Sequence, residues 1–206
     1  MASDRELLTA WRDGSTRAGA DLTARHYDSL YAFFRNKVGD DIDDLLQKTM
    51  LACMQAGPRF EGRSSFRTFM FAVARNVLMA HLRKRRRDAA IDVDEVSVED
   101  LGTTPSGVVA RTRQARLLLR GLRLIPVEYQ VVLELYYWES MTSGELAEVL
   151  GIPHSTARTK LRRGREALAR RMEAAAADAD AARSTLDNLD RWAAGLREAV
   201  LAPAAP

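Results

Sequence analysis

The stretch MTSGELAEVLGIPHSTARTKLRRGREALARR, residues 141–171, has the pattern of two short helices joined by a tight turn. Thr142 followed three residues later by Glu145 is a capping box, which satisfies free backbone N–H groups where a helix begins. Gly151 stands where the turn needs a residue that tolerates positive φ, and Pro153 suits the first turn of a second helix. The stretch therefore predicts a helix-turn-helix.

The second helix of this motif is strongly basic, with seven Lys or Arg residues against one acid between Ser155 and Arg171. Its apolar residues recur at helical spacing and should face inward: Ala157, Leu161, Leu168 and Met172. The other side then carries Ser155, Arg158, Thr159 and Arg162, flanked by Thr156 and Arg163. Arg can donate two hydrogen bonds to a guanine edge, and Ser or Thr can bond several base edges, so this face favours major-groove binding. A solvated basic face on an ordinary surface helix is the alternative.

The composition of the whole chain sets limits on the class of protein. Its 206 residues allow one large or two small domains, 47% are hydrophobic, and the net charge of +3 is unevenly distributed. Cys53 is the only cysteine, which excludes a disulfide within the chain and a Cys-rich zinc site. No stretch reaches the ~18 apolar residues of a membrane span, and residues 1–15 lack a targeting pattern. We expect a soluble, cytoplasmic protein with no membrane insertion.

Four amphipathic helices are predicted in the first 87 residues. Ser3 or Asp4 caps the first, which Gly14 stops. The second runs from about residue 19 to 38, with an apolar side made of Tyr27, Leu30, Phe33, Phe34 and Val38. The fourth is capped by Ser64 or Ser65, and its expected core stripe is Phe66, Phe69, Met70, Val73 and Val77.

The third of these helices begins within an acidic run, residues 40–44, where the helix dipole favours carboxylates. Its buried stripe includes Ile42 and Leu45. The opposite face then presents four polar side chains to solvent or to a partner: Asp41, Asp44, Gln47 and Lys48. Two carboxylates three residues apart offer too few ligands for Mg²⁺, and no phosphate-binding loop accompanies them. We expect no metal and no cofactor.

The loop before the fourth helix, and that helix itself, combine aromatic and basic residues. Arg59, Phe60, Arg63, Ser64 and Ser65 form a short exposed segment that could stack an unpaired base and hold its backbone, although a plain surface loop is the alternative. Basic and amide residues lie off the core stripe of the helix: Arg67, Arg75, Asn76, Arg83 and Lys84, followed by the rest of the RKRRR run. This interleaving favours a nucleic-acid surface over a solvated helix end.

The charge of the chain changes from basic to acidic between residues 88 and 110, which contain six acids and no Lys or Arg. Together with its Gly, Pro and Ser residues, this predicts a flexible acidic linker that packs into no core. The expected organisation is all-α: a helical domain at 1–87, the linker at 88–112, a helix-turn-helix domain at 113–172, and an Ala-rich extension at 173–206 with a final amphipathic helix.

Four motifs in this order resemble the extracytoplasmic-function (ECF) group of bacterial RNA polymerase sigma factors. They are DDLLQKTMLAC (43–53), RFEGRSSFRTFMFAVARN (59–76), LIPVEYQVVLELYYWE (124–139) and MTSGELAEVLGIPHSTARTKLRRGR (141–165). They look like the family's regions two and four, and the resemblance covers roughly residues 5–172. It implies a non-catalytic protein that binds core RNA polymerase and promoter DNA, melts the minus-10 element with its first domain, and contacts the minus-35 element with its second.

The resemblance also implies roles for single residues. Asp41, Asp44, Leu45 and Gln47 would dock on the clamp helices of the largest polymerase subunit. The loop at 59–65 would hold a flipped base, and the exposed face of the second helix-turn-helix element would enter the upstream major groove. An anti-sigma factor is implied as a further partner. Gln130 stands where the family commonly has Arg.

Two other classes of protein remain as alternatives. The first is a stand-alone helix-turn-helix regulator that uses its first domain as a sensor. The second is a recombinase or nuclease with residues 40–44 as metal ligands; the three histidines show no ligand pattern that would support it.

Overall fold

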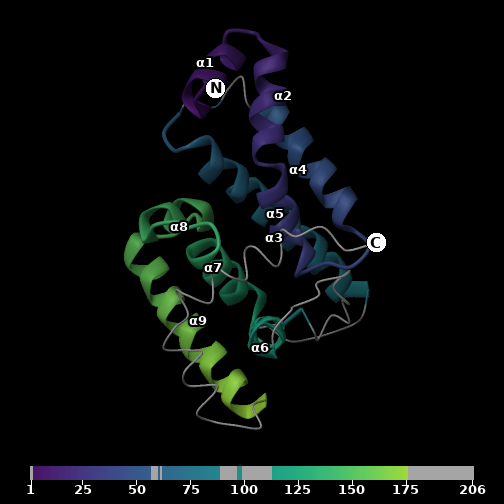
Figure 1. Ribbon diagram of the computed structural model, residues 1–206, viewed down its shortest axis with the longest axis vertical. Coiled ribbons are helices and arrows are strands. Elements are labelled where there is room, and N and C mark those ends of the chain that lie inside the picture. Colours follow the sequence, from purple (N-terminus) through teal and green to yellow (C-terminus); the bar gives the residue numbers. More distant parts are fainter. Residues whose placement is uncertain (1, 57–59, 61, 89–96, 99–112, 176–206) are drawn as a thin grey trace.

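The computed structural model describes residues 2–56, 60, 62–88, 97–98 and 113–175. Within them lie nine α-helices: α1 (Asp4–Arg12), α2 (Thr16–Arg25), α3 (Tyr27–Arg35), α4 (Ile42–Ala56), α5 (Phe66–Asp88), α6 (Arg113–Arg123), α7 (Val127–Tyr137), α8 (Ser143–Leu150) and α9 (His154–Ala175). The described part is thus all-α, as the sequence predicts (Figure 1). We call residues 2–88 the N-terminal half and residues 113–175 the C-terminal half. The final amphipathic helix predicted after residue 175 lies outside the described residues.

The predicted caps of the N-terminal half are confirmed at α1 and α5. Ser3 and Glu6 form a complete capping box at the start of α1, and Gly14 follows the helix with a φ of 102°. The Ser65 hydroxyl accepts a hydrogen bond from the backbone N–H of Thr68 at 3.0 Å, so Ser65 caps α5. These local signals determine where the helices begin because they satisfy N–H groups that have no partner within the helix.

The single helix predicted for residues 19–38 is wrong. The structure has two helices, α2 and α3, which break at His26, whose φ of −101° and ψ of 4° are not helical. The His26 ring contacts the Asp4 carboxylate of α1 at 2.7 Å, a tertiary contact that no local pattern reveals. The break also changes the predicted apolar side: Leu30, Phe33, Phe34 and Val38 are buried, whereas Tyr27 is 41% exposed and stacks on Tyr31.

The buried stripe of α5 is shifted from the predicted one. Phe66 and Met70 are buried as expected, but Phe69, Val73 and Val77 are only partly buried. The remaining buried apolar residues of this helix are Phe71, Ala74, Leu78 and Leu82. The reason is that α5 packs against α4 on one side and against α8 of the C-terminal half on another, so two neighbours share its apolar surface.

The prediction that the acidic linker packs into no core is wrong at its described residues. Ser97 and Val98 are both buried, and Ser97 forms an antiparallel β-bridge with Pro126, the N-cap residue of α7. An apolar side chain therefore enters the core from within an acidic segment. The rest of the predicted linker, apart from Asp88 at the end of α5, lies outside the described residues.

The C-terminal half is built around α7. Val131, Val132, Leu133 and Leu135 are buried, so this helix is enclosed on more than one face. Its neighbour α9 approaches closely at Gly164, where a Cβ atom would lie 3.4 Å from Leu133. Two acids and an amide are buried with the apolar residues of α7 or just after it: Gln130, Glu134 and Glu139.

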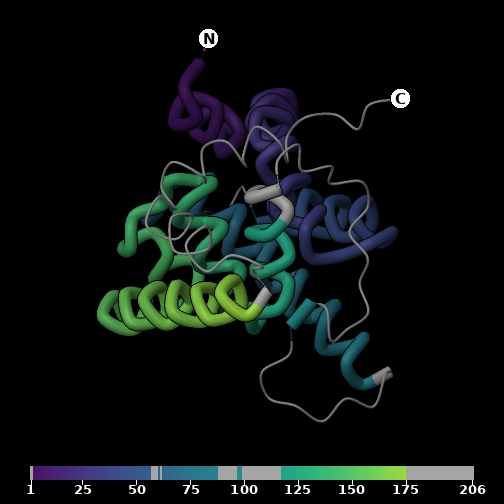
Figure 2. Tube along the Cα trace, turned by 60° about the horizontal axis from the view of Figure 1, so that its bottom comes forward, coloured from purple at the N-terminus to yellow at the C-terminus, as the bar shows by residue number. Residues whose placement is uncertain are grey.

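The two halves share one continuous core. Helix α8 lies against α5. Polar contacts also join the turn after α3, and α5, to α7 and to the turn that follows α7. The two views of the chain both show the C-terminal helices alongside the N-terminal ones (Figures 1 and 2). The chain is therefore closed, with its two halves in contact.

We predict that Gly19→Ala destabilises the N-terminal half. A Cβ atom at Gly19 would lie 2.6 Å from the Trp11 ring, which is buried and cannot move away freely. Overpacking of this kind costs about 1–3 kcal/mol, which urea unfolding can measure. The matched control is Gly144→Ala in α8, where the nearest atom is 3.7 Å away, and it should stabilise the chain or leave it unchanged. Equal stability of the two variants would contradict this packing.

Candidate nucleic-acid interface

The helix-turn-helix has the predicted geometry. The Thr142 hydroxyl accepts a hydrogen bond from the Glu145 N–H at 3.2 Å, and the Glu145 carboxylate accepts one from the Thr142 N–H at 2.8 Å. Gly151 adopts a φ of 64°, which turns the chain between α8 and α9. The Ser143 hydroxyl and the His154 ring lie 2.6 Å apart and join the starts of the two helices. These contacts fix α9 relative to α8.

The exposed side of α9 carries the residues that the sequence assigns to DNA binding. All six are exposed: Ser155, Thr156, Arg158, Thr159, Arg162 and Arg163. The opposite side, with Ala157, Leu161, Leu168 and Met172, is buried as predicted. The Thr159 hydroxyl donates to the Ser155 carbonyl at 3.0 Å, and the Arg162 guanidinium pairs with Glu166 one turn later. The closed chain therefore leaves this face open to solvent.

Two other cations of α9 contact α7 instead. The Lys160 ammonium bonds to the Glu128 carboxylate, and the Arg165 guanidinium lies 5.3 Å and 5.4 Å from the ring centroids of Tyr136 and Tyr137. Lys160 and Arg165 thus help to hold α9 to α7, although Arg165 lies seven residues after Arg158 on the same side of the helix and is itself exposed.

An aromatic pair and a polar stripe lie together on the N-terminal half. Phe60, before α5, and Phe69, within it, have ring centroids 4.7 Å apart. One side of α5 continues from Phe69 through exposed residues at helical spacing: Asn76, Ala80, Arg83, Lys84 and Arg87. Arg63 and Ser65 are exposed and Ser64 is partly buried, whereas Arg59 lies outside the described residues. The predicted base-stacking loop thus adjoins a basic stripe.

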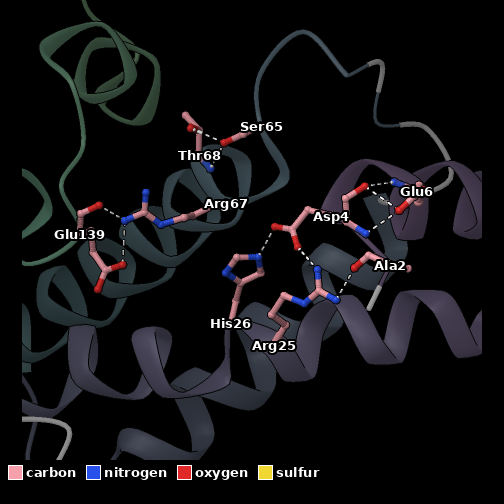
Figure 3. Close-up of polar contacts among 10 residues, drawn as sticks. Ala2, Asp4, Glu6, Arg25, His26, Ser65, Arg67, Thr68 and Glu139 are labelled. Carbon is pink, nitrogen blue, oxygen red and sulfur yellow. Dashed lines mark hydrogen bonds and ion pairs between the residues drawn. The ribbon is translucent and has the colours of Figure 1, made fainter.

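Arg67 and Arg75, which the sequence assigns to the same DNA surface, point elsewhere. The Arg67 guanidinium donates to the Glu139 carboxylate at 2.9 Å and also to the Glu139 carbonyl (Figure 3). The Arg75 guanidinium lies 3.7 Å from the Glu128 carboxylate. In this conformation both cations are partly buried and paired with acids of the C-terminal half, so they do not belong to the exposed stripe, and their role in DNA binding stays a prediction. The sequence could not show this because the partners lie more than 50 residues away.

The predicted polymerase-docking residues lie on or beside α4, and three of the four reach solvent. Asp44 and Gln47 are exposed, while Asp41 is half-exposed and its carboxylate lies 3.6 Å from His81 and 3.8 Å from Arg85. Leu45 is only 1% exposed, so its side chain supports the helix from within and cannot itself be offered to a partner. The exposed side of α4 continues with two large apolar residues, Leu51 and Met54.

A group of four polar residues at the junction of the two halves was missed by the sequence analysis. We call it the polar cluster: Asn36, Lys37, Gln130 and Glu134, all buried. The Glu134 carboxylate pairs with the Lys37 ammonium and accepts hydrogen bonds from Asn36 Nδ2 at 3.0 Å and Gln130 Nε2 at 2.9 Å. The one available signal was an acid inside the apolar run VVLELYYW.

Burial affects the ammonium group of Lys37 within the polar cluster. Removal from water lowers the pKa of the Lys37 ammonium, and the neighbouring Glu134 carboxylate partly offsets this effect. The Lys37 ammonium also donates to the Phe33 carbonyl at 2.6 Å and lies 4.2 Å from the centre of the Phe33 ring. The pair therefore has the hydrogen bonds that a buried ion pair requires.

Within the described residues, no cluster of three or more His, Cys, Asp or Glu side chains could hold a metal ion. No helix of that part of the chain has the length and apolar character needed to span a membrane.

Family models match both halves of the chain. The model for sigma-70 region 2 matches residues 22–88, and the model for sigma-70 region 4 matches residues 115–168, which together make up more than half of the sequence. The chain belongs to the sigma-70 family, in its ECF group. It is a sigma factor, a transcription initiation factor that binds core RNA polymerase and directs transcription from promoters. The predicted all-α class, the ECF resemblance and the predicted sigma-factor function are thereby confirmed.

Individual relatives and solved structures agree with this family. The ECF RNA polymerase sigma factor SigW of Bacillus subtilis is 24% identical over 172 residues, with 78% of this chain and 92% of the relative covered. The RNA polymerase sigma factor HrpL of Pseudomonas syringae pv. syringae is 29% identical over 173 residues, with 81% and 94% covered. The fold is similar to that of CnrH in complex with the cytosolic domain of CnrY, at a TM-score of 0.62 and 23% identity over 84% of this chain and 99% of CnrH.

The Glu128 carboxylate contacts both Lys160 and Arg75. These contacts predict that the free energy of unfolding of this sigma factor depends on pH. The hydrogen bond from Lys160 lowers the pKa of the Glu128 carboxylate, burial opposes this, and the charges of Lys160 and Arg75 add to the lowering. Because the folded-state pKa lies below the unfolded one, the contribution is complete above the unfolded pKa and is lost as the pH falls through the folded pKa. We expect the free energy of unfolding of Glu128→Gln, measured by urea unfolding, to fall less at acid pH than that of the wild type. Glu148→Gln, at an exposed position on α8, is the control, and an unchanged curve for Glu128→Gln would contradict the assignment.

Proposed function

We propose that the C-terminal half of this ECF sigma factor contacts the minus-35 element through α9, and that the N-terminal half docks on polymerase and stabilises the melted minus-10 element. The proposal rests above all on one observation, the exposed face of α9 at Ser155, Arg158, Thr159 and Arg162. The buried side of the same helix, packed on α7 and α8, supports this face rigidly. We further propose that the factor works in the cytoplasm, where its polymerase acts.

Recognition of the upstream element would use direct contacts to base edges. Arg158 and Arg162 lie four residues apart on one side of α9, and Ser155 and Thr159 lie on the same side. An arginine that donates two hydrogen bonds to guanine discriminates against other bases by ~1–3 kcal/mol. Arg163 and Thr156 flank this group and are suited to phosphate contacts, which position the helix without specifying sequence.

Melting would use the aromatic pair and the basic stripe of α5. A base taken out of the duplex stack loses favourable contacts, and stacking on an aromatic side chain returns ~1–3 kcal/mol per base. Phe60 and Phe69 adjoin each other and the α5 stripe that leads to Arg83 and Lys84. An unpaired strand could therefore place a base on the aromatic pair while its phosphates follow the cations.

Docking on the polymerase would use the exposed side of α4. The carboxylates of Asp41 and Asp44 and the amide of Gln47 are available on its surface, with Leu45 holding the helix in place from below. Two proteins of similar fold have been solved with a bound protein: RpoE with the anti-sigma factor NepR from Bartonella quintana, at a TM-score of 0.57, and CnrH with the cytosolic domain of CnrY. We propose that this factor too is controlled by an anti-sigma partner.

The alternative of a stand-alone helix-turn-helix regulator has no support in the family comparison, because the first half matches sigma-70 region 2. Transcription in vitro with purified core polymerase tests the proposal directly. The factor should start RNA chains at defined sites only when core enzyme is present. Tight operator binding by the isolated chain, without any initiation in the presence of core enzyme, would contradict it.

We predict that Arg158→Ala lowers transcription from cognate promoters by roughly 5- to 150-fold, which corresponds to the ~1–3 kcal/mol of a bidentate contact. Initiation from a panel of promoters with single changes in the minus-35 element is the measurement. Arg170→Ala, an exposed arginine farther along the same helix, is the matched control and should have little effect. An equal loss on all promoter variants would assign Arg158 to a phosphate instead.

We predict that Asp44→Arg abolishes copurification with core polymerase while the chain remains folded. The Asp44 side chain is half-exposed and its ion pair is with Lys48 on the same helix, so the change reverses surface charge without opening the core. Asp28→Arg, on an exposed position of α3, is the control for charge reversal. Retained copurification of Asp44→Arg would remove α4 from the docking surface.

A further inference from the structure

Helix α1 precedes the part of the chain that the region 2 model matches, residues 22–88, yet it belongs to the same core. Its Trp11 ring is buried and meets the Phe66 ring edge-on, with 6.0 Å between the ring centroids. The Phe66 ring in turn lies 6.3 Å from the ring of Phe69, a member of the aromatic pair. Helix α1 is therefore anchored beside the rings on which an unpaired base is proposed to stack.

Polar contacts fix the other end of α1. The Asp4 carboxylate accepts a hydrogen bond from the Arg25 guanidinium at 2.6 Å and lies 2.7 Å from the His26 ring (Figure 3). The same guanidinium donates a hydrogen bond to the Ala2 carbonyl at 2.7 Å. The first turn of α1 is thus held by Asp4 and its last turn by Trp11, so the direction of the helix is fixed at both ends.

The last turn of α1 brings Arg12 to the loop before α5. Arg12 is exposed, and its guanidinium nitrogen Nη1 lies 4.0 Å from the position that a Cβ atom would have at Gly62. Gly62 has a φ of 71°, a conformation that favours glycine, and the missing side chain leaves its backbone open to this cation. Among the described residues, Arg12 forms no ion pair with an acid. Its guanidinium is therefore available to an anion at this loop.

The Arg12 guanidinium is close enough to the aromatic pair to share one DNA strand with it. Two residues span at most ~7 Å between Cα atoms, so the Arg12 guanidinium lies within roughly 13 Å of the Phe60 Cα atom by way of Gly62. Helix α1 lies at the start of α5, whereas Arg83 and Lys84 are near its end (Figure 1). A strand whose base stacks on the pair would therefore meet cations on both sides of that base.

We propose that Arg12 binds a phosphate of the unpaired promoter strand, next to the base held on the aromatic pair. The ligand is the backbone of single-stranded DNA, which a guanidinium recognises through charge and hydrogen bonds without specifying sequence. Helix α1 thereby extends the strand-binding surface beyond the residues that the region 2 model matches. This inference rests on the proposed role of the aromatic pair in melting.

The first experiment measures how strongly binding to an unpaired strand depends on salt. Holoenzyme reconstituted from core polymerase and the full-length factor would bind a cognate promoter whose minus-10 element is already unpaired. Loss of one phosphate contact to a single strand decreases the slope of log affinity against log salt by about 0.7, so Arg12→Ala should show this decrease. Arg12→Lys keeps the charge and should keep the slope. An unchanged slope for Arg12→Ala would overturn the inference.

Arg17→Ala is the matched control for the loss of one positive charge. Arg17 is an exposed cation of α2, and its guanidinium lies 4.0 Å from the Asp21 carboxylate of the same helix. The slope for Arg17→Ala should remain that of the wild type. An equal decrease for the two variants would assign the effect to the overall charge of the protein and would contradict a contact at Arg12.

Neutral phosphates locate the contact along the strand. A methylphosphonate replaces one charged oxygen by a methyl group, and the promoter strand would carry one such group at a time on either side of the unpaired base. The wild type should lose affinity at one phosphate next to this base, and Arg12→Ala should lose no further affinity at that phosphate, because the two changes remove the same contact. If both proteins lose affinity equally at every position, Arg12 binds none of these phosphates.

Phe60→Ala separates this inference from the proposed melting function. If Phe60→Ala weakens binding to the unpaired promoter and Arg12→Ala does not, the Arg12 contact alone is wrong. If neither variant changes binding, the proposed strand-binding surface is itself wrong. If only Arg12→Ala weakens binding, the base is not held on the aromatic pair, and the position proposed for the phosphate is wrong.

Discussion

The buried pair of Lys37 and Glu134 is the interaction on which the arrangement of this sigma factor depends. It joins two segments 97 residues apart, and its carboxylate also binds the amides of Asn36 and Gln130. Each of the four groups would be costly if buried alone, because an unpaired polar group loses its hydration without compensation. The Glu134 carboxylate gives a partner to a donor of each of the other three, whereas the Gln130 side-chain oxygen has none among the described residues, and the group joins the turn after α3 to α7.

For DNA binding, the basic residues fall into two groups: those exposed to solvent and those that contact other side chains of the protein. The cations Arg158, Arg162 and Arg163 of α9 and those on the stripe of α5 are exposed, whereas Arg67, Arg75 and Lys160 are partly buried and contact acids on or just after α7. Net charge alone does not reveal this division, since both sets contribute equally to it. A guanidinium that is already paired with a carboxylate offers less to a phosphate until that pair separates.

The helix-turn-helix and the region 2 helices also differ in the sequence distance between the residues whose contacts set their geometry. The capping box at Thr142 and the glycine at 151 settle the geometry of α8 and α9 within about ten residues. Region 2 depends on longer contacts, such as the ring of His26 against Asp4, which accompanies the break between α2 and α3. Val98 shows the same dependence, since its burial requires a surface formed by other parts of the chain.

The sequence by itself determined the all-α class, the capped helix start at Thr142, the helix starts at 3–4 and 64–65 to within one residue, the buried and exposed sides of α9, and the family. Caps and helical periodicity depend on neighbours within a few residues, so they can be inferred without tertiary structure. Only the tertiary structure decided the split at His26, the burial of Val98 within an acidic segment, the pairing of Arg67 and Arg75 with acids, and the polar cluster. Those features depend on which distant side chain meets each residue, and a charged group shows the same pattern in the sequence whether water or a buried partner will surround it.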